Sequence, residues 1–205
     1  KGVETLAKYA SMFGLSEKSG VEIPESEPEI SDEYAVQSAI GQGTNNFTVS
    51  QLNRYVTAVA NSGTVYDLTL IDKITDSNGN LIKDYQAEVI STMDEIDSST
   101  WDLVHQGMKK MVDSSATFAG LDFDMAGKTG TAQQSAVHAD HALFVGYAPT
   151  DSPEISIAVR MAYGYSSSYA AEIGRDIAKI YFDPDSADDL ITGSAGELGS
   201  ALAGD

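Results

Sequence analysis

Apolar residues recur every three or four positions in four stretches of the chain, which is the period of an amphipathic helix. Local signals mark where these helices begin or end. Thr48-Val49-Ser50-Gln51 has the form of a capping box, in which the Thr hydroxyl and the Gln amide each satisfy a backbone N–H group of the first turn. Gly14 and Asn61-Ser62-Gly63 follow the first two stretches, and Asp183-Pro184 follows the last one. We therefore expect four helices, carried by Val3 to Phe13, Val49 to Val59, Trp101 to Val112 and Ile173 to Ile180.

Five further stretches have the composition of strands. The first two, Leu68 to Ile74 and Leu81 to Tyr85, flank Asn78-Gly79, a dipeptide that favours a tight hairpin because both residues tolerate positive φ. The other three follow in quick succession and are Met125 to Gln133, Ala142 to Ala148 and Ile155 to Tyr163. The order of the elements predicts an α+β fold rather than a doubly wound α/β fold. It runs from helices through a hairpin, a helix and three antiparallel strands to a closing helix packed back on those strands.

The composition changes along the chain and divides it into two parts. Residues 1–182 have the apolar content of a globular domain, while residues 183–205 hold six acidic residues, no basic residue and several Gly and Ser. The second part therefore has the composition of a disordered tail. Inside the first part, residues 20–29 combine acidic side chains with Pro24 and Pro28, which predicts an exposed, irregular loop.

The charge balance excludes several classes of partner. The 205 residues include 12 Lys and Arg against 31 Asp and Glu, a net charge of −19. Binding to nucleic acid or to anionic lipid requires clustered basic residues, so neither is expected. No apolar run reaches the roughly 18 residues that a membrane helix needs. Without cysteine the chain has no disulfide and no thiolate site. Separately, no cofactor is predicted.

Residues 126–133, Ala-Gly-Lys-Thr-Gly-Thr-Ala-Gln, carry the most informative chemistry. Alternation along a strand places Lys128 and Gly130 on one face and Thr129 and Thr131 on the other. Gly130 lets a ligand lie close to the backbone, and Lys128 offers a positive charge in an acidic chain. An edge strand of this kind can pair with an extended peptide and hold a carboxylate. The alternative interpretation is an ordinary surface strand, because a Lys-Thr-Gly triplet is also common by chance.

Several segments around this motif occur in a characteristic order. They are Gly14 to Pro24, Ala39 to Gly43, the motif itself, His141 to Pro149 and Pro153 to Val159. This series resembles the transpeptidase domain of class B penicillin-binding proteins, the cell-wall D,D-transpeptidases of the serine penicillin-recognising superfamily. The resemblance covers roughly residues 1–182. It implies the fold that β-lactamases share with penicillin-binding transpeptidases, an antiparallel sheet packed with helices.

Only one of the family's three active-site elements is found in the chain. The family uses Ser-x-x-Lys, a Ser-x-Asn type motif and Lys-Thr-Gly. Here no Lys has a Ser three positions before it, and no Asn has a Ser two positions before it. In the family both missing elements precede the segment that Lys1 to Phe13 resembles. We therefore expect an incomplete domain, the C-terminal part of a transpeptidase domain without the nucleophilic Ser.

The resemblance also implies roles for the motif residues. Lys128 would hold the carboxylate of the substrate or of a β-lactam and help tune proton transfer, and the hydroxyls of Thr129 and Thr131 would hydrogen-bond that carboxylate. The backbone N–H of Thr131 would be one oxyanion-hole donor, and Gly130 would keep the approach clear for an acyl group. Loss of one such donor typically lowers kcat by about 10²–10³.

For the intact protein, the resemblance implies a D,D-transpeptidase that cross-links peptidoglycan stem peptides through an acyl-Ser intermediate. It also implies binding of β-lactams, contacts with cell-wall synthesis proteins, and a position at the extracytoplasmic face of the bacterial cytoplasmic membrane with an anchor outside this chain. This piece alone is expected to be inactive and to make no membrane contact. Two alternatives are a non-catalytic penicillin-binding-like module for protein or cell-wall binding, and a β-lactamase, which the long segment before Lys128 disfavours.

Two other groups of residues invite interpretation as metal sites. His138, Asp140 and His141 lie close together, and six acidic residues crowd residues 22–33. The first group lacks a further ligand and the second lacks EF-hand spacing, so no metal site is predicted. We interpret His141 as fixing the start of a strand and the acidic residues as a solvated loop. Gly41-Gln42-Gly43 lacks the Lys-Ser/Thr ending of a phosphate-binding loop and is interpreted as a turn before the second helix. The family resemblance places this turn near the active-site region.

Overall fold

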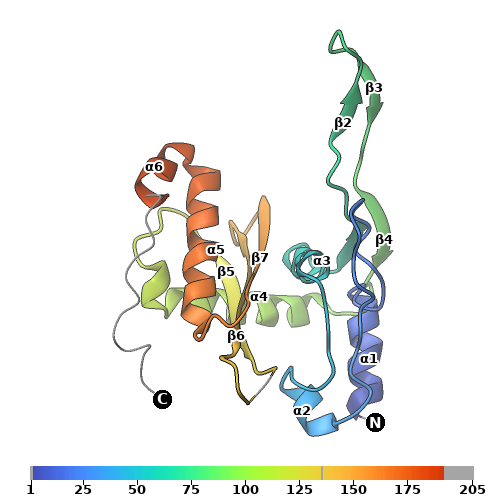
Figure 1. The fold of residues 1–205 in the computed structure, drawn as a ribbon, viewed down its shortest axis with the longest axis vertical. Helices are drawn as coiled ribbons and strands as arrows, with labels where there is room; N and C mark the ends of the chain where they lie inside the picture. Colours follow the sequence, from blue (N-terminus) through green and yellow to red (C-terminus); the bar gives the residue numbers. More distant parts are fainter. Residues whose placement is uncertain (1, 135, 192–205) are drawn as a thin grey trace.

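The computed structural model describes residues 2–134 and 136–191, and its elements confirm the predicted α+β fold class (Figure 1). The helices are α1 (Gly2–Met12), α2 (Ala35–Ala39), α3 (Val49–Ala60), α4 (Ser98–Asp113), α5 (Ser167–Phe182) and α6 (Ala187–Leu190). The strands are β1 (Thr64–Asp67), β2 (Lys73–Thr75), β3 (Leu81–Asp84), β4 (Glu88–Thr92), β5 (Ala126–Ala132), β6 (His141–Ala148) and β7 (Ile155–Met161). Two short 3-10 helices are η1 (Ala116–Phe118) and η2 (Pro184–Ser186).

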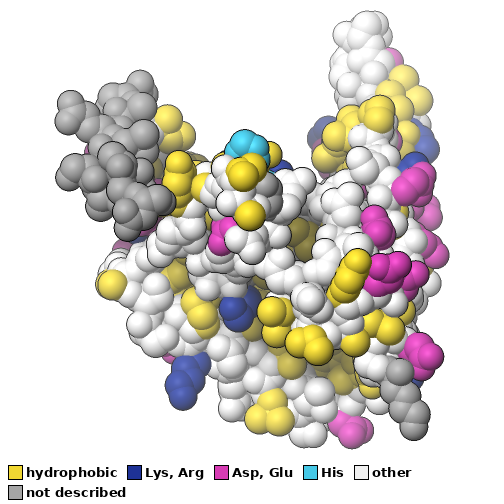
Figure 2. Space-filling model, turned by 60° about the horizontal axis from the view of Figure 1, so that its bottom comes forward, with side chains coloured by type: hydrophobic (Ala, Val, Ile, Leu, Met, Phe, Trp, Pro, Cys, Tyr) yellow, Lys and Arg dark blue, Asp and Glu magenta, His cyan; other side chains and the backbone are white. Residues whose placement is uncertain are grey.

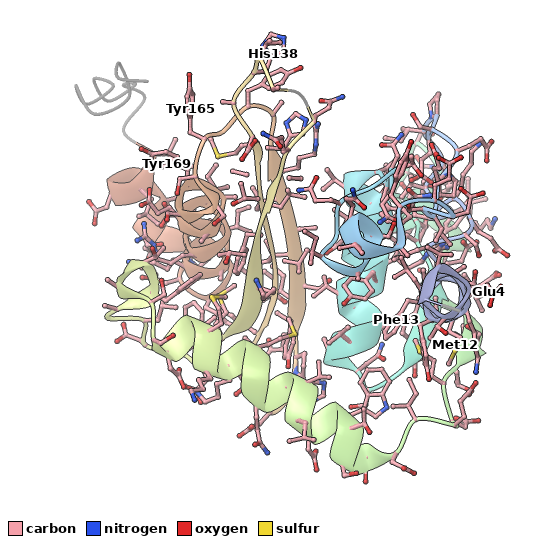
Figure 3. All side chains as sticks on the ribbon, turned by 90° about the horizontal axis from the view of Figure 1, so that it is seen from below. Glu4, Met12, Phe13, His138, Tyr165 and Tyr169 are labelled. Carbon is pink, nitrogen blue, oxygen red and sulfur yellow. The ribbon has the colours of Figure 1, made fainter. Side chains whose placement is uncertain are left out.

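Strands β5, β6 and β7 form one antiparallel sheet with β6 in the middle. The pairing of β5 with β6 runs from Ala126↔Tyr147 to Ala132↔His141. In the described part of the chain, the other edge of β5 has no strand partner. Helix α5 covers one face of the sheet, α3 lies on the other, and α4 crosses one end (Figures 1 and 3). Helices therefore cover both faces of the sheet around its mostly buried middle strand β6, while β5 is partly exposed and its outer edge is open.

The core on the α5 face surrounds Phe144, which is fully buried. The spacing of Ile173 and Ile177 predicts the closing helix but not the face that it buries, because both side chains are 40% exposed. Helix α5 instead buries small residues, namely Ala170, Ala171, Gly174 and Ala178. The three alanines belong to the same buried cluster as Phe144. Gly174 lies directly on the ring, and a Cβ added there would overlap it.

The predicted hairpin is formed by β2 and β3, and it projects from the body of the molecule (Figure 1). Its turn lies at Asn78-Gly79, where Gly79 has a φ of 84°. The strand predicted from Leu68 to Ile74 is wrong over residues 68–72, because β2 begins only at Lys73. Strands β1 and β4 pair with each other at the base of the hairpin and were not predicted. All five residues of β4 are exposed, so the strand has no apolar alternation to reveal it.

The predicted tail differs from expectation at its beginning. Residues 184–190 form η2 and α6, and the Ser186 hydroxyl donates to the carbonyl oxygen of Asp183 at 2.7 Å. Pro184 stands at the start of η2, where its fixed φ suits a helical turn. Residues 192–205 lie outside the described residues, and for them the disordered tail remains a prediction.

Candidate functional site

The residues of the Lys-Thr-Gly motif lie together on the edge strand β5: Lys128, Thr129, Gly130 and Thr131. Directly paired residues of neighbouring strands project to the same face of a sheet. Thr129 pairs with Phe144, which packs under α5, and Lys128 pairs with Val145, which packs toward α3. The two threonines therefore share the α5 face, while Lys128 and Gly130 occupy the α3 face, as the alternation predicted.

The ammonium group of Lys128 is exposed and lies over its own strand. Its Nζ donates to the carbonyl oxygen of Thr129 at 2.5 Å. Within residues 2–134 and 136–191, no carboxylate forms an ion pair with Lys128. On the face shown in Figure 2, most acidic side chains gather on the side of the molecule that carries α1 and the hairpin. The charge of Lys128 is thus free to attract an anion that approaches β5.

The end of β5 is held by a side chain from the turn after α2. The Gln42 amide, in the orientation that satisfies both partners, places Nε2 3.1 Å from the carbonyl oxygen of Gln133 and Oε1 3.2 Å from its N atom. Gln133 directly follows Ala132, whose pairing with His141 is the last one between β5 and β6. Gln42 therefore bonds to the backbone in the manner of a neighbouring strand.

This contact shows which backbone groups line the open edge. In an antiparallel strand, the N–H and C=O of one residue point to the same side, and the side alternates along the chain. Gln133 turns both groups toward Gln42, so the backbone groups of Thr131 and Thr129 turn to the same open side. The bond from Lys128 Nζ to the Thr129 carbonyl oxygen agrees with this assignment. The Thr131 N–H accordingly points away from β6, where a ligand could accept from it.

Gly41-Gln42-Gly43 is a turn, as predicted, and glycine is required at both ends. The φ values are 82° at Gly41 and 88° at Gly43. At Gly43 space is also limiting, because a Cβ there would lie 2.7 Å from Ser31 Oγ and 2.8 Å from Ser38 Oγ. These two hydroxyls are buried and lie 2.7 Å apart, within hydrogen-bond distance. The turn is therefore packed tightly against a buried polar pair.

His141 fixes the start of β6, as predicted. It is 6% exposed, and its Nδ1 accepts from the Tyr163 N–H at 3.0 Å, so the proton of the neutral ring is on Nε2. Nε2 lies 2.6 Å from Gln134 Oε1 and 3.1 Å from Arg160 Nη2. Burial and the Arg160 guanidinium lower the pKa of His141. Among the described residues, no group of three potential metal ligands is found.

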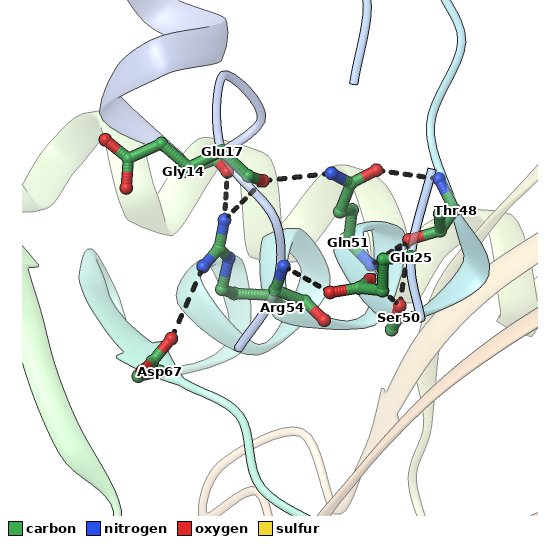
Figure 4. A network of polar contacts seen from close by, with 9 residues as sticks. Gly14, Glu17, Glu25, Thr48, Ser50, Gln51, Arg54 and Asp67 are labelled. Atoms are coloured by element: carbon green, nitrogen blue, oxygen red, sulfur yellow. Dashed lines mark hydrogen bonds and ion pairs between the residues drawn. The ribbon is translucent and has the colours of Figure 1, made fainter. Parts of the chain in front are cut away.

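A polar network behind α3 was missed at the sequence level (Figure 4). The pattern predicts an apolar face of Val49, Leu52, Val56 and Val59 on this helix; Val56 and Val59 are buried, but Val49 is 40% exposed. Gln51 and Arg54 are buried as well. Gln51 Nε2 donates to the Glu17 carbonyl oxygen at 2.9 Å, and Arg54 Nη2 donates to the carbonyl oxygens of Gly14 and Glu17. The acceptors are backbone groups more than 30 residues away, so only a break in the apolar spacing could have indicated the network.

One residue of the acidic loop is not merely solvated. Glu25 accepts hydrogen bonds from the Ser19 N–H at 2.8 Å, Thr48 Oγ1 at 2.9 Å and Ser50 Oγ at 2.5 Å. Burial opposes ionisation of Glu25, but the hydrogen bonds outweigh it and lower the pKa of this carboxyl. Glu25 thereby ties the loop to the first turn of α3, and the prediction of a purely solvated loop is wrong at this position.

Comparison with known proteins gives one consistent result. Residues 1–179 match the model of the penicillin binding protein transpeptidase domain. Penicillin-binding protein 2A of Bacillus subtilis is 29% identical over 214 residues, which cover 91% of this chain and 30% of that protein. The peptidoglycan D,D-transpeptidase MrdA of Haemophilus influenzae is 24% identical over 220 residues, which cover 89% of this chain and 33% of that protein. The structure of penicillin-binding protein 2B from Streptococcus pneumoniae (strain R6) matches with a TM-score of 0.76 at 24% identity, over 95% of this chain and 34% of that one.

The chain thus spans about a third of the length of the relatives that it matches. Within the described ranges, none of the helices has the length and apolar character needed to cross a membrane.

Proposed function

Because the chain belongs to the penicillin-binding protein transpeptidase family, we propose that it is the C-terminal part of the transpeptidase domain of a class B peptidoglycan D,D-transpeptidase. The intact enzyme cross-links the stem peptides of peptidoglycan through an acyl-Ser intermediate, and β-lactams acylate the same Ser. It works at the extracytoplasmic face of the cytoplasmic membrane, beside other cell-wall synthesis proteins, with its anchor outside this chain.

One observation carries the proposal: the ammonium group of Lys128, which forms no ion pair with any of the described residues, stands beside a strand edge that is open in the same part of the chain. A stem peptide is an extended chain that ends in a carboxylate, and an open edge offers backbone groups for such a chain. Lys128 attracts the carboxylate, and the hydroxyls of Thr129 and Thr131 hydrogen-bond it. Gly130 leaves room for the acyl group against the strand.

Thr131 has a second role, which its backbone performs. When a Ser oxygen attacks a carbonyl carbon, negative charge develops on the carbonyl oxygen, and a fixed N–H donor stabilises it. The Thr131 N–H faces the open edge and is one such donor. The second donor and the nucleophile belong to the part of the domain that carries Ser-x-x-Lys, a motif that this chain does not contain. The chain by itself is accordingly inactive.

The test is acylation by a fluorescent penicillin. We expect a covalent adduct on the intact protein and none on the 205-residue chain. In the intact protein, Lys128→Ala should lower the acylation rate by about 10²-fold, whereas Lys110→Ala, at an exposed position on α4, should leave it unchanged. An adduct on the chain alone, or wild-type acylation of the Lys128→Ala protein, would contradict the proposal.

A non-catalytic, penicillin-binding-like module is the second candidate, and the absence of Ser-x-x-Lys from this chain is the observation that favours it. The same experiment separates the two. A folded intact protein that no penicillin acylates, and whose upstream sequence also lacks Ser-x-x-Lys, would be such a module.

A further inference from the structure

We propose that Gln42 is a positioning residue of the active site, which holds the end of β5 through its side-chain amide and thereby fixes the Thr131 N–H. The inference rests on the proposed function, because it concerns the geometry of the same strand. Its basis is the pair of hydrogen bonds between the Gln42 amide and the Gln133 backbone, at 3.1 and 3.2 Å.

Such a support is needed at this point of the sheet. The pairing of β5 with β6 ends at Ala132↔His141, only one residue after Thr131. The last residues of a strand fray when no partner holds them, because each unpaired residue regains backbone freedom. Gln42 supplies the missing partner at Gln133, two residues beyond the proposed oxyanion donor.

Gln42 can act as a support because its own backbone is fixed on both sides. Its N–H donates to the carbonyl oxygen of Gln37 at 2.9 Å, and its carbonyl oxygen accepts from Asn45 Nδ2 at 3.1 Å. Asn45 in turn accepts from the N–H of Ser31 at 2.9 Å, and Ser31 is fully buried. The amide is therefore carried by a turn whose backbone is hydrogen-bonded on both sides of Gln42.

The contact also closes one end of the open edge. Backbone groups of Gln133 that are bonded to Gln42 cannot bond to a ligand, so an extended peptide can pair with β5 only up to Thr131. Gln42 consequently marks where the peptide-binding edge stops, and it places the reacting carbonyl beside the last free N–H.

The expected effect is on the acylation step rather than on initial binding. A misplacement of about 1 Å at a reacting group can lower a rate by about 10²-fold. In the intact protein, Gln42→Ala should therefore lower the acylation rate constant for a penicillin by roughly 10- to 100-fold. The dissociation constant of the non-covalent complex should change less than about threefold, because Lys128 and the two threonine hydroxyls are untouched. Gln106→Ala, at an exposed position on α4, is the matched control and should change neither constant.

A second variant separates positioning from a general loss of structure. In Gln42→Glu, the protonated carboxyl group can donate and accept as the amide does, whereas the carboxylate repels the Gln133 carbonyl oxygen. The deficit of this variant relative to wild type should therefore shrink as the pH falls from about 8 to about 5, toward the ordinary pKa range of a Glu side chain. A purely structural defect has no reason to be reversed by protonation.

The outcomes distinguish this inference from the proposed function. If the wild-type intact protein is not acylated at all, the proposed function fails. If it is acylated, and Gln42→Ala behaves like Gln106→Ala, the function stands and the positioning role of Gln42 is wrong. A pH-independent deficit in Gln42→Glu would also overturn the positioning role, while a deficit in the acylation constant that protonation relieves supports it.

Discussion

The ring of Phe144 lies so close to Gly127 that a Cβ at position 127 would be 2.6 Å from both Cε2 and Cζ of the ring. Phe144 pairs with Thr129 across the sheet, and Gly127 directly precedes Lys128. The packing of the core and the placement of the candidate site residues are therefore coupled through one aromatic ring.

We predict that Gly127→Ala destabilises the protein, because the added methyl group must displace the buried ring. The expected cost is about 1–3 kcal/mol in the free energy of unfolding. Urea unfolding followed by the fluorescence of Trp101, the single Trp and 5% exposed, measures it. Gly107→Ala is the control, since nothing lies within 4 Å of its added Cβ in α4, and it should stabilise by about 0.5–1 kcal/mol.

The same coupling can be measured with a double mutant. Phe144→Leu removes the ring atoms that the Cβ would meet, so Gly127→Ala should cost less in that background. If Gly127→Ala lowered the free energy of unfolding equally in both backgrounds, the ring would not be what limits the size of the residue at position 127.

The hydroxyl of Thr131 should contribute to ligand affinity in the intact protein. Thr131→Val keeps the shape and the backbone N–H but removes a hydrogen bond to the carboxylate. Because hydrogen bonds to charged groups are worth about 1.5–3 kcal/mol, the dissociation constant for a penicillin should rise about 10- to 100-fold. Thr100→Val, exposed in the first turn of α4, should leave the constant unchanged. Similar constants for the two variants would exclude a carboxylate contact at Thr131.

Arg54 should be more important for stability than its position on a surface helix suggests. The side chain is 1% exposed and donates to two backbone carbonyls of the turn after α1. Arg54→Met removes a buried donor from both carbonyls and leaves the Glu17 carbonyl with Gln51 Nε2 as its side-chain donor. We expect a loss of about 3 kcal/mol in the free energy of unfolding. Arg175→Met, on a partly exposed side chain of α5, should cost clearly less. Unfolding curves of the two variants decide the comparison.

Stability should fall in acid partly because of Glu25. Its pKa is lowered in the folded state, so the folded protein binds this proton less readily than the unfolded chain. The resulting stabilisation is present above the unfolded pKa of about 4.3 and is lost as the pH falls through the lower, folded value. Glu25→Gln should be less stable than wild type at pH 7, and the difference should shrink below about pH 4. A difference that stays constant over this range would show that the charge of Glu25 contributes nothing.

The sequence by itself determined the features that depend on neighbours along the chain. The capping box at Thr48 and Gln51 is present in full, and the turn at Gly79 and the ends at Gly14 and Gly63 have the positive φ that glycine permits. Alternation along residues 126–132 was sufficient to assign the faces of β5, because period two is a property of any strand. The order of the elements then specified the α+β class.

Only the tertiary structure decided which distant groups meet. The bonds from Gln42 to Gln133 and from Arg54 to Gly14 join positions 91 and 40 residues apart, and neither pair has a periodic signal. Which face of α5 is buried was likewise decided by the core, because the ring of Phe144 lies where a side chain at Gly174 would be. Local propensity acts over a few residues, whereas hydrogen-bond satisfaction and close packing act wherever the folded chain brings groups together. In this protein, local propensity defined the strand that carries the candidate site. Tertiary hydrogen bonds and close packing defined what holds that strand in place.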